Sequence, residues 1–270
     1  MCSRGWPEPD CKRTFMDLSI PHLYPLYALP VLLALLVGMW FPVTGHLRDQ
    51  QLKRQYYRVQ LVTFVSAVLG AKLTFLFGEF LWPLRPLDSW EQVVYSGRSI
   101  VGALIFGLLG AELAKPFFRY PLPPNDRFAA QLPFAFAIGR LGCLFSGCCR
   151  GTPFESPWSV TYSDGIARHP APLYEILFQL LAGCVALWLV KKQRLSGCVF
   201  SVYLMAYGSF RFFSEFLRET PKPMGSLSGY QWLSILMVVL GGIFYRRNLL
   251  RRERDRQTND LSDPTVATSL

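Results

Sequence analysis

A bend rich in glycine and cysteine, residues 139–151, follows an apolar run and carries Arg140. An arginine at the end of a membrane-depth helix is costly unless it faces water, a partner charge or an anionic ligand. Glycine residues beside it allow a backbone or a lipid headgroup to approach closely. These residue types predict that Arg140 meets one of these three partners at a membrane surface.

A second polar motif, residues 168–175, stands at the start of a later apolar run. It contains His169, and a histidine side chain is a candidate for acid–base chemistry. A solvated histidine at the membrane interface is the alternative. Tyr174 and Glu175 fall in the first turns of the predicted helix, where the helix dipole favours a glutamate. For Glu175 this dipole role and contact with a ligand both stay open.

A third motif, residues 210–219, lies near the exit of the next apolar run. Arg211 and Glu215 are four residues apart, so they share one helix face and can form an ion pair. In one interpretation the pair only packs helices together inside the bundle. In the other, Arg211 holds an anionic group and Glu215 orients it, because ionisable residues within membranes are usually functional.

Three cysteines, Cys143, Cys148 and Cys149, lie in the bend. They lack the spacing of a zinc site and no histidine is close in sequence, so no metal is expected. The adjacent Cys148 and Cys149 can form a disulfide, act as a redox pair or accept an acyl group if they face an oxidising compartment. Small packing residues are the alternative.

The composition is typical of a membrane protein. Of 270 residues, 51% are hydrophobic and 17% charged, whereas about 25% of a soluble domain is charged. The net charge of +10 does not indicate nucleic-acid binding, because the basic residues lie mostly between apolar runs.

Apolar runs that approach the length of a bilayer span recur seven times. They predict an all-α polytopic membrane protein with about seven transmembrane helices, near residues 24–43, 60–81, 100–117, 128–145, 172–190, 197–217 and 230–245. A polar N-terminal segment, residues 1–23, precedes this membrane domain at 24–245. A basic and then polar tail, residues 246–270, follows it.

The loops predict the orientation. Clusters of Lys and Arg follow the first, third, fifth and seventh runs, and the alternate loops are poorer in basic residues. Because basic loops stay in the cytoplasm, the N-terminus is expected outside and the C-terminus inside. The bend at 139–151, the 168–175 motif and the exit of the sixth run then share the outer face.

With these motifs in place, the chain resembles the bacterial prolipoprotein diacylglyceryl transferases over roughly residues 60 to 245. The matching motifs, in chain order, are Gly70-Ala71-Lys72-Leu73, Gly139-Arg140-Leu141-Gly142, Arg168-His169-Pro170 with Leu173-Tyr174-Glu175, Tyr207-Gly208 with Phe210-Arg211 and Glu215-Phe216, and Gln231 with Leu233-Ser234. Each motif alone is weak, but their order and their positions on the runs are fairly specific.

The resemblance implies an enzyme of the bacterial inner membrane that needs no metal, nucleotide or other cofactor. Such an enzyme moves diacylglycerol from phosphatidylglycerol to the thiol of a lipobox cysteine in a prolipoprotein and releases glycerol 1-phosphate. The implied partners are phosphatidylglycerol, prolipoprotein signal peptides and membrane lipids.

The resemblance also assigns expected roles. Arg140 would bind the lipid phosphate, because guanidinium pairs with phosphate in a bidentate fork. Arg211, held by Glu215, would stabilise charge on the departing phosphate. A base must form the acceptor thiolate, and His169 is a candidate through its residue type alone. The expected substrate-binding residues are Arg140, Gly142, Ser146, Tyr174 and Glu175.

Two departures from the family pattern concern the chemistry. Val101 stands where the family has a histidine before a Gly-Gly-Leu-Ile run, so one candidate base is missing. After Arg140, cysteines at 143 and 148 stand in place of asparagine and glutamate. The alternatives are therefore a branch with another acceptor, one that uses Cys143 or Cys148 in catalysis, or a thiol-redox membrane protein using Cys148 and Cys149.

A non-catalytic lipid-binding or transport protein is a further alternative. Against transport, the charged motifs are predicted near one face of the membrane, whereas transporter sites lie near the midplane.

Overall fold

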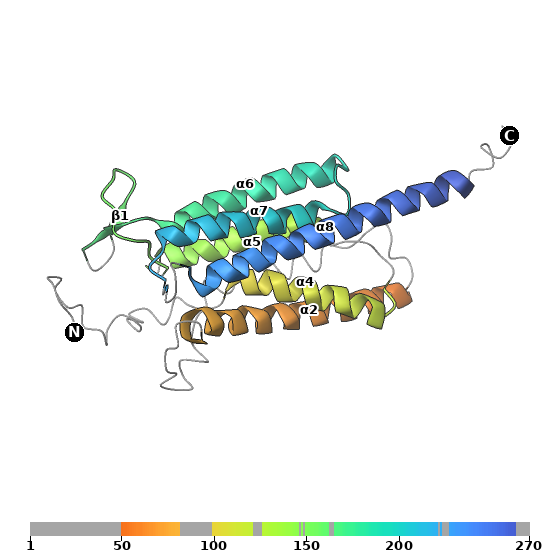
Figure 1. The fold of residues 1–270 in the computed structure, drawn as a ribbon, viewed down its shortest axis with the longest axis horizontal. Helices are drawn as coiled ribbons and strands as arrows, with labels where there is room; N and C mark the ends of the chain where they lie inside the picture. The colour runs from red at the N-terminus through yellow and green to blue at the C-terminus, as the bar shows by residue number, and fades with distance from the viewer. Residues whose placement is uncertain are drawn as a thin grey trace.

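The computed structural model describes residues 50–81, 99–120, 126–145, 147, 149–161, 165–220, 222 and 227–262. Within these residues the chain is a bundle of long helices with a small two-stranded sheet at one end (Figure 1). The helices are α2 (Gln50–Leu76), α4 (Ile100–Phe117), α5 (Asp126–Phe145), α6 (Ala171–Lys191), α7 (Val199–Ser214) and α8 (Gly229–Ser262). A π-helical turn, η1 (Phe77–Leu81), extends α2, and a 3-10 turn, η2 (Glu215–Leu217), extends α7.

Six of the seven predicted membrane segments coincide with these helices, and the first, residues 24–43, lies outside the described residues. In the described part of the chain, four helical stretches are long and apolar enough to cross a membrane: Gln50–Glu79, Ile100–Phe117, Ala171–Lys191 and Gly229–Asp255. The apolar part of α5, Phe128–Leu144, is shorter. The structure is thus mostly helical, as expected, while the number of seven spans and the orientation stay predictions.

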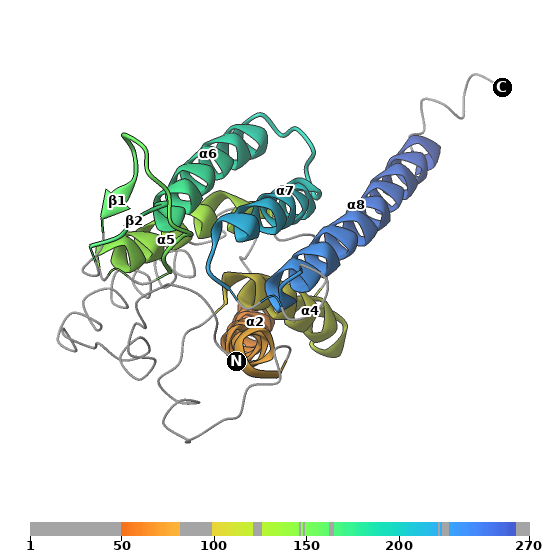
Figure 2. The same ribbon diagram turned by 60° about the vertical axis from the view of Figure 1, so that its left-hand side comes forward.

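The helices pack mainly as neighbours in sequence. Helix α2 lies against α4, α5 against α6, and α7 against α8, while α8 also contacts α4 (Figures 1 and 2). The α2–α4 pair is close because α4 has a glycine at its crossing point. A Cβ atom at Gly102 would overlap the Thr74 hydroxyl and the Gly70 carbonyl of α2. Small residues commonly bring membrane helices together in this way.

The core is an apolar cluster at the centre of the bundle. Its buried members come from α4, α5, α6, α7 and α8 and include Leu104, Leu108, Leu204 and Met237. Many large apolar side chains on the outer faces of α2, α6 and α8 are exposed, among them Leu61, Leu69, Leu177, Leu181 and Val239. An outer surface of this kind suits contact with lipid chains rather than water.

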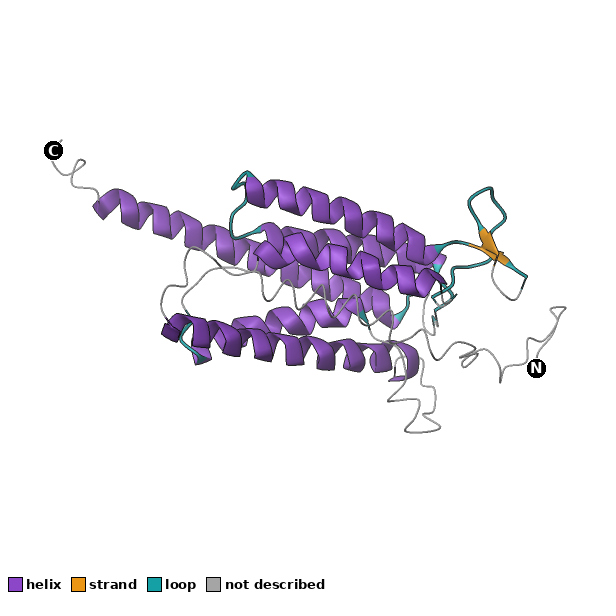
Figure 3. Ribbon diagram, turned by 180° about the vertical axis from the view of Figure 1, so that it is seen from behind, coloured by secondary structure: helices purple, strands orange, loops and turns teal. Residues whose placement is uncertain are grey.

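A strap of extended chain closes the end of the bundle at which α5 finishes and α6 begins. Strand β1 (Val160–Thr161) pairs antiparallel with β2 (Ala167–Arg168), and Figure 3 shows this sheet beyond the helix ends. Gly151 donates its N–H to the His169 carbonyl (3.2 Å), and Thr152 donates to the Leu217 carbonyl (2.9 Å). The segment at 151–152 therefore ties the start of α6 to the exit of α7.

At the opposite end, Asp126 of α5 caps α7. Its carboxylate accepts hydrogen bonds from the backbone N–H of Gly197 and, at 3.3 Å, of Phe200. Because these amides have no partner within the helix, we expect Asp126→Ala to lower the free energy of unfolding by about 1–2 kcal/mol. Thermal unfolding in detergent measures the loss. Asp126→Asn, which keeps one acceptor oxygen, should lose less, and an equal loss in both variants would contradict a capping role.

Candidate active site

Charged side chains from three separate segments meet at the end of the bundle beneath the strap. Arg140 comes from the last turns of α5, Glu175 from the second turn of α6, and Arg211 from the last turn of α7. Glu215 lies in η2, and Arg218 follows directly. All these helix ends lie at the end marked by β1 in Figure 1. The three predicted motifs are therefore brought together at one end of the bundle, and the assignment of this end to the outer face stays a prediction.

These side chains form one chain of ion pairs. Arg140 Nε lies 3.0 Å from Glu175 Oε1, and Arg211 Nη1 lies 2.6 Å from Glu215 Oε2. Arg218 connects the two pairs, with Nη1 3.9 Å from Glu175 Oε2 and Nε 3.9 Å from Glu215 Oε2. Three guanidinium groups and two carboxylates leave one net positive charge in this cluster.

The cluster is almost closed to solvent. Glu175 is 1% exposed, Glu215 0% and Arg211 4%. Charges removed from water in this way need close partners, and removal of one partner typically costs about 3–5 kcal/mol. Glu175 is paired with a cation, while its predicted roles at the helix dipole and in contact with a ligand stay predictions. The carboxylate contacts Arg140 rather than the start of its own helix, where no side chain caps the backbone.

The ion pairs leave part of the guanidinium hydrogen-bonding capacity unused. Arg218 Nε is buried, and among the described residues it has no hydrogen-bond acceptor, since the Glu215 carboxylate oxygen beside it is 3.9 Å away. A buried donor without an acceptor costs about 1–3 kcal/mol. An anion with several oxygens would satisfy this donor and balance the net positive charge.

Polar groups behind the carboxylates hold them in place. Tyr207 donates its hydroxyl to Glu175 Oε1 at 2.6 Å, the oxygen that also faces Arg140. Ser228, just before α8, donates its hydroxyl to Glu215 Oε1 at 3.3 Å. Each carboxylate thus has a hydroxyl on one side and guanidinium groups on the other.

The cluster also reaches α2 through an aromatic ring. The Arg211 guanidinium lies over the Tyr230 ring, 5.8 Å from its centroid. Tyr230 in turn donates its hydroxyl to Glu79 in the π-helical turn η1 (3.1 Å). π-Helical turns of this kind are common at functional sites.

The cysteine-rich half of the bend lies against Arg140. Arg140 Nη1 is 3.9 Å from Cys143 Sγ and 3.6 Å from Cys149 Sγ. Gly142 is buried nearby. Ser146 and Cys148 lie outside the described residues, so their predicted roles stay predictions. Among the described residues, no group of three or more His, Cys, Asp or Glu side chains is placed to hold a metal ion.

His169 lies on the strap side of the site. Its ring stacks on Phe154 with 3.8 Å between centroids, and its Nδ1 is 3.2 Å from the Tyr174 hydroxyl. Its backbone pairs with residues 151–152. The two predicted site residues His169 and Tyr174 therefore contact each other, at the edge of the cluster rather than within the chain of ion pairs.

Arg218 and Tyr207 have no predicted role, although both belong to motifs recognised in the sequence. Arg218 lies three residues after Glu215, a spacing that allows an ion pair, but its contact with Glu175 depends on the fold. Burial alone would lower the pKa of Arg218, but the neighbouring Cys149 and Glu215 raise it above its ordinary value. Arg218 therefore stays charged and serves as the third cation of the cluster.

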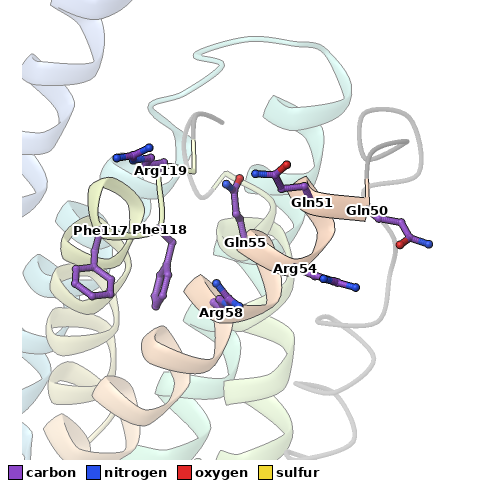
Figure 4. Close-up of a pocket in the computed structure, with 8 residues that line it drawn as sticks. All are labelled: Gln50, Gln51, Arg54, Gln55, Arg58, Phe117, Phe118 and Arg119. Atoms are coloured by element: carbon purple, nitrogen blue, oxygen red, sulfur yellow. The ribbon is translucent and has the colours of Figure 1, made fainter.

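A separate open pocket of about 600 Å³ lies at the opposite end of the bundle (Figure 4). Its lining includes Arg54, Arg58 and Arg119, together with Phe117 and Phe118. None of the predicted site residues lines this pocket. The pocket lies at the end of the bundle that is rich in basic loops. The buried cluster of paired charges lies at the other end.

The sequence matches the family described as Prolipoprotein diacylglyceryl transferase over residues 16–247. The chain belongs to this family. The resemblance to this family over residues 60–245 is thereby confirmed. Membership of the family makes the chain a transferase.

Individual relatives in the prolipoprotein diacylglyceryl transferase family are moderately similar to this chain. The phosphatidylglycerol–prolipoprotein diacylglyceryl transferase of Cupriavidus metallidurans is 31% identical, with 84% of this chain and 92% of the relative covered. That of Polynucleobacter asymbioticus is 36% identical over 67% of this chain and 71% of its own. The second such enzyme of Clostridium perfringens is 28% identical, over 74% of this chain and 81% of its own.

One departure from the family pattern has a clear structural setting. Val101, which replaces the expected histidine, is 1% exposed and belongs to the apolar core cluster. This position of the transferase therefore supplies packing and no titratable group. Family membership together with the apolar helices makes the chain a multi-pass membrane protein.

Proposed function

We propose that this transferase binds phosphatidylglycerol through its phosphate and transfers the diacylglyceryl group to the thiol of a lipobox cysteine in a prolipoprotein. Glycerol 1-phosphate leaves. The observation that carries the proposal is the buried cluster of Arg140, Arg211 and Arg218, which has one excess positive charge and a buried Arg218 N–H donor without an acceptor among the described residues. A phosphodiester carries one negative charge and several acceptor oxygens, so it matches both properties.

In the proposed reaction the lipid phosphate binds to the three guanidinium groups of the cluster. The acceptor thiolate attacks the carbon of the diacylglyceryl unit that bears the phosphate ester. A C–S bond forms there, and the C–O bond between that carbon and the phosphate oxygen breaks. The oxygen leaves with the bonding electrons as part of glycerol 1-phosphate. Guanidinium groups held in place by Glu175 and Glu215 stabilise this developing charge without rearrangement, which is the main requirement for such catalysis.

The cluster is proposed to face the outer side of the inner membrane, as the basic loops predict. The opposite end of the described bundle carries Arg119, Lys191, Arg194 and the basic turns of α8. This placement opens the site toward signal peptides that emerge from the membrane, and Gly142, Ser146 and Tyr174 would line the substrate position.

His169 is the proposed base for the acceptor thiol. For this role the imidazole must be neutral, with the proton on Nδ1 donated to the Tyr174 hydroxyl, so that Nε2 keeps its lone pair. We therefore expect His169→Ala to lower the transfer rate by about 100-fold or more, as loss of a general base does. Tyr174→Phe should lower it less. Transfer rates of both variants measured across pH 5–9 test the assignment, and a His169→Ala rate within a factor of about three of the unmodified enzyme would contradict it.

Complementation tests the proposed function in cells. A strain depleted of its own transferase should recover lipidation of a reporter prolipoprotein when it expresses this chain. It should not recover when it expresses Arg140→Ala at the same level in the membrane. Good membrane expression without lipidation of any prolipoprotein would reject this acceptor class.

A further inference from the structure

Two cysteines of the bend, Cys143 and Cys149, contact Arg140, the cation expected to bind phosphate. Cys143 stands where the family pattern has a polar residue, and Cys149 adjoins another such position. Cys143 Sγ and Cys149 Sγ both approach the same nitrogen, Arg140 Nη1, at 3.9 and 3.6 Å. Both cysteines are present as thiols and are only partly buried. The proposed reaction has no use for a second thiol of the enzyme next to the lipid phosphate.

Cys149 is the nearer of the two to the guanidinium, with its Sγ 3.6 Å from Arg140 Nη1. Cys149 is also an electrostatic neighbour of Arg218 and helps to raise the pKa of that guanidinium above its ordinary value. Nearby cations favour the thiolate, which is the nucleophilic form of cysteine.

The backbone fixes Cys149 at this position. Its φ is 59°, in the left-handed region that non-glycine residues rarely adopt. The turn is held by Arg150, whose Nε donates to the Gly147 carbonyl at 2.9 Å, and by the N–H of Gly151. A strained conformation held by its surroundings is typical of functional positions.

We propose that Cys149 is a reactive thiol, a modification site for small soft electrophiles, and that its adduct blocks the anion position at Arg140. With a maleimide as the electrophile, the sulfur adds to one alkene carbon to form a C–S bond. The other alkene carbon takes a proton from water, while the thiol proton is lost to solvent. The second half of this proposal, competition with lipid phosphate, rests on the proposed function.

The test is alkylation of the full-length protein in detergent by N-ethylmaleimide at pH 6, with modified positions resolved by mass spectrometry. At this pH an ordinary thiol is almost entirely protonated, so we expect folded protein to label at Cys149 at least about tenfold faster than the same chain in denaturant. Fragment spectra must separate Cys149 from Cys148. Equal rates in the folded and denatured chains would overturn the proposal.

Two controls link the reactivity to Arg140. Arg140→Gln should bring the Cys149 rate close to that of the denatured chain, and an unchanged rate in a folded variant would overturn the cationic origin. In the unmodified protein, micelles that contain phosphatidylglycerol should slow labelling at Cys149, whereas phosphatidylcholine micelles should not. Equal rates in both lipids would overturn the shared position. Failure of the unlabelled enzyme to release glycerol phosphate would instead reject the proposed function. The faster labelling of Cys149 in the folded than in the denatured chain would still be expected.

Discussion

Arg140→Ala should lower the release of glycerol phosphate from phosphatidylglycerol by at least about 100-fold, the usual loss when one donor to a developing oxyanion is removed. Arg140 is the cation that connects the bend with α6, through the ion pair of its Nε with Glu175 Oε1 at 3.0 Å. Release is measured with purified protein at saturating acceptor peptide.

Controls separate binding from folding in this prediction. Arg140→Lys keeps the charge but loses the planar fork, so it should retain an intermediate rate. Arg194→Ala removes an arginine at the far end of α6, where it lies over Trp188, and should leave the rate unchanged. A folded Arg140→Ala variant that releases glycerol phosphate within tenfold of the unmodified enzyme would exclude Arg140 from the site.

The second large effect is expected at the Arg211–Glu215 pair. A structural role for this pair affects stability, whereas a functional role also affects glycerol phosphate release. Glu215→Ala should lower the free energy of unfolding by about 3–5 kcal/mol, since it leaves a buried guanidinium short of its closest partner. The 2.6 Å contact and the complete burial of Glu215 place the pair in this class. Thermal unfolding in detergent gives the loss, and activity is measured on the fraction that stays folded.

A double variant distinguishes the two roles. Arg211→Met combined with Glu215→Leu replaces the ion pair by apolar groups of similar size, and such replacements are often neutral for stability. We expect the double variant to recover most of the lost stability but no glycerol phosphate release. If it recovers both, the pair only packs the bundle, and Arg211 plays no part in the reaction.

The hydrophobic pattern predicts the helices well because lipid-facing and core-facing residues are both apolar along each span. It does not predict where the helices end when the residues beyond the span also favour a helix. Helix α8 passes the apolar limit at Tyr245 and continues to Ser262, because the arginines that follow are good helix formers. The two strands of the strap are only two residues each and are too short to show a pattern in the sequence.

Local spacing predicts contacts within one helix but not contacts between helices. The Arg211–Glu215 pair follows from the four-residue spacing and is confirmed by the structure. The pairing of Arg140 with Glu175 and the bridging position of Arg218 join segments far apart in the sequence, and only packing brings them together. The same limit applies to the contact between Arg140 and Cys149.

The most direct test of the central claim is a single reaction with purified full-length protein, phosphatidylglycerol and a peptide that carries a lipobox cysteine. The proposed function predicts equal amounts of glycerol 1-phosphate and of peptide with a diacylglyceryl thioether, and the loss of both products in Arg140→Ala. A folded, unmodified protein that binds phosphatidylglycerol but releases no glycerol phosphate in the presence of the peptide would contradict it.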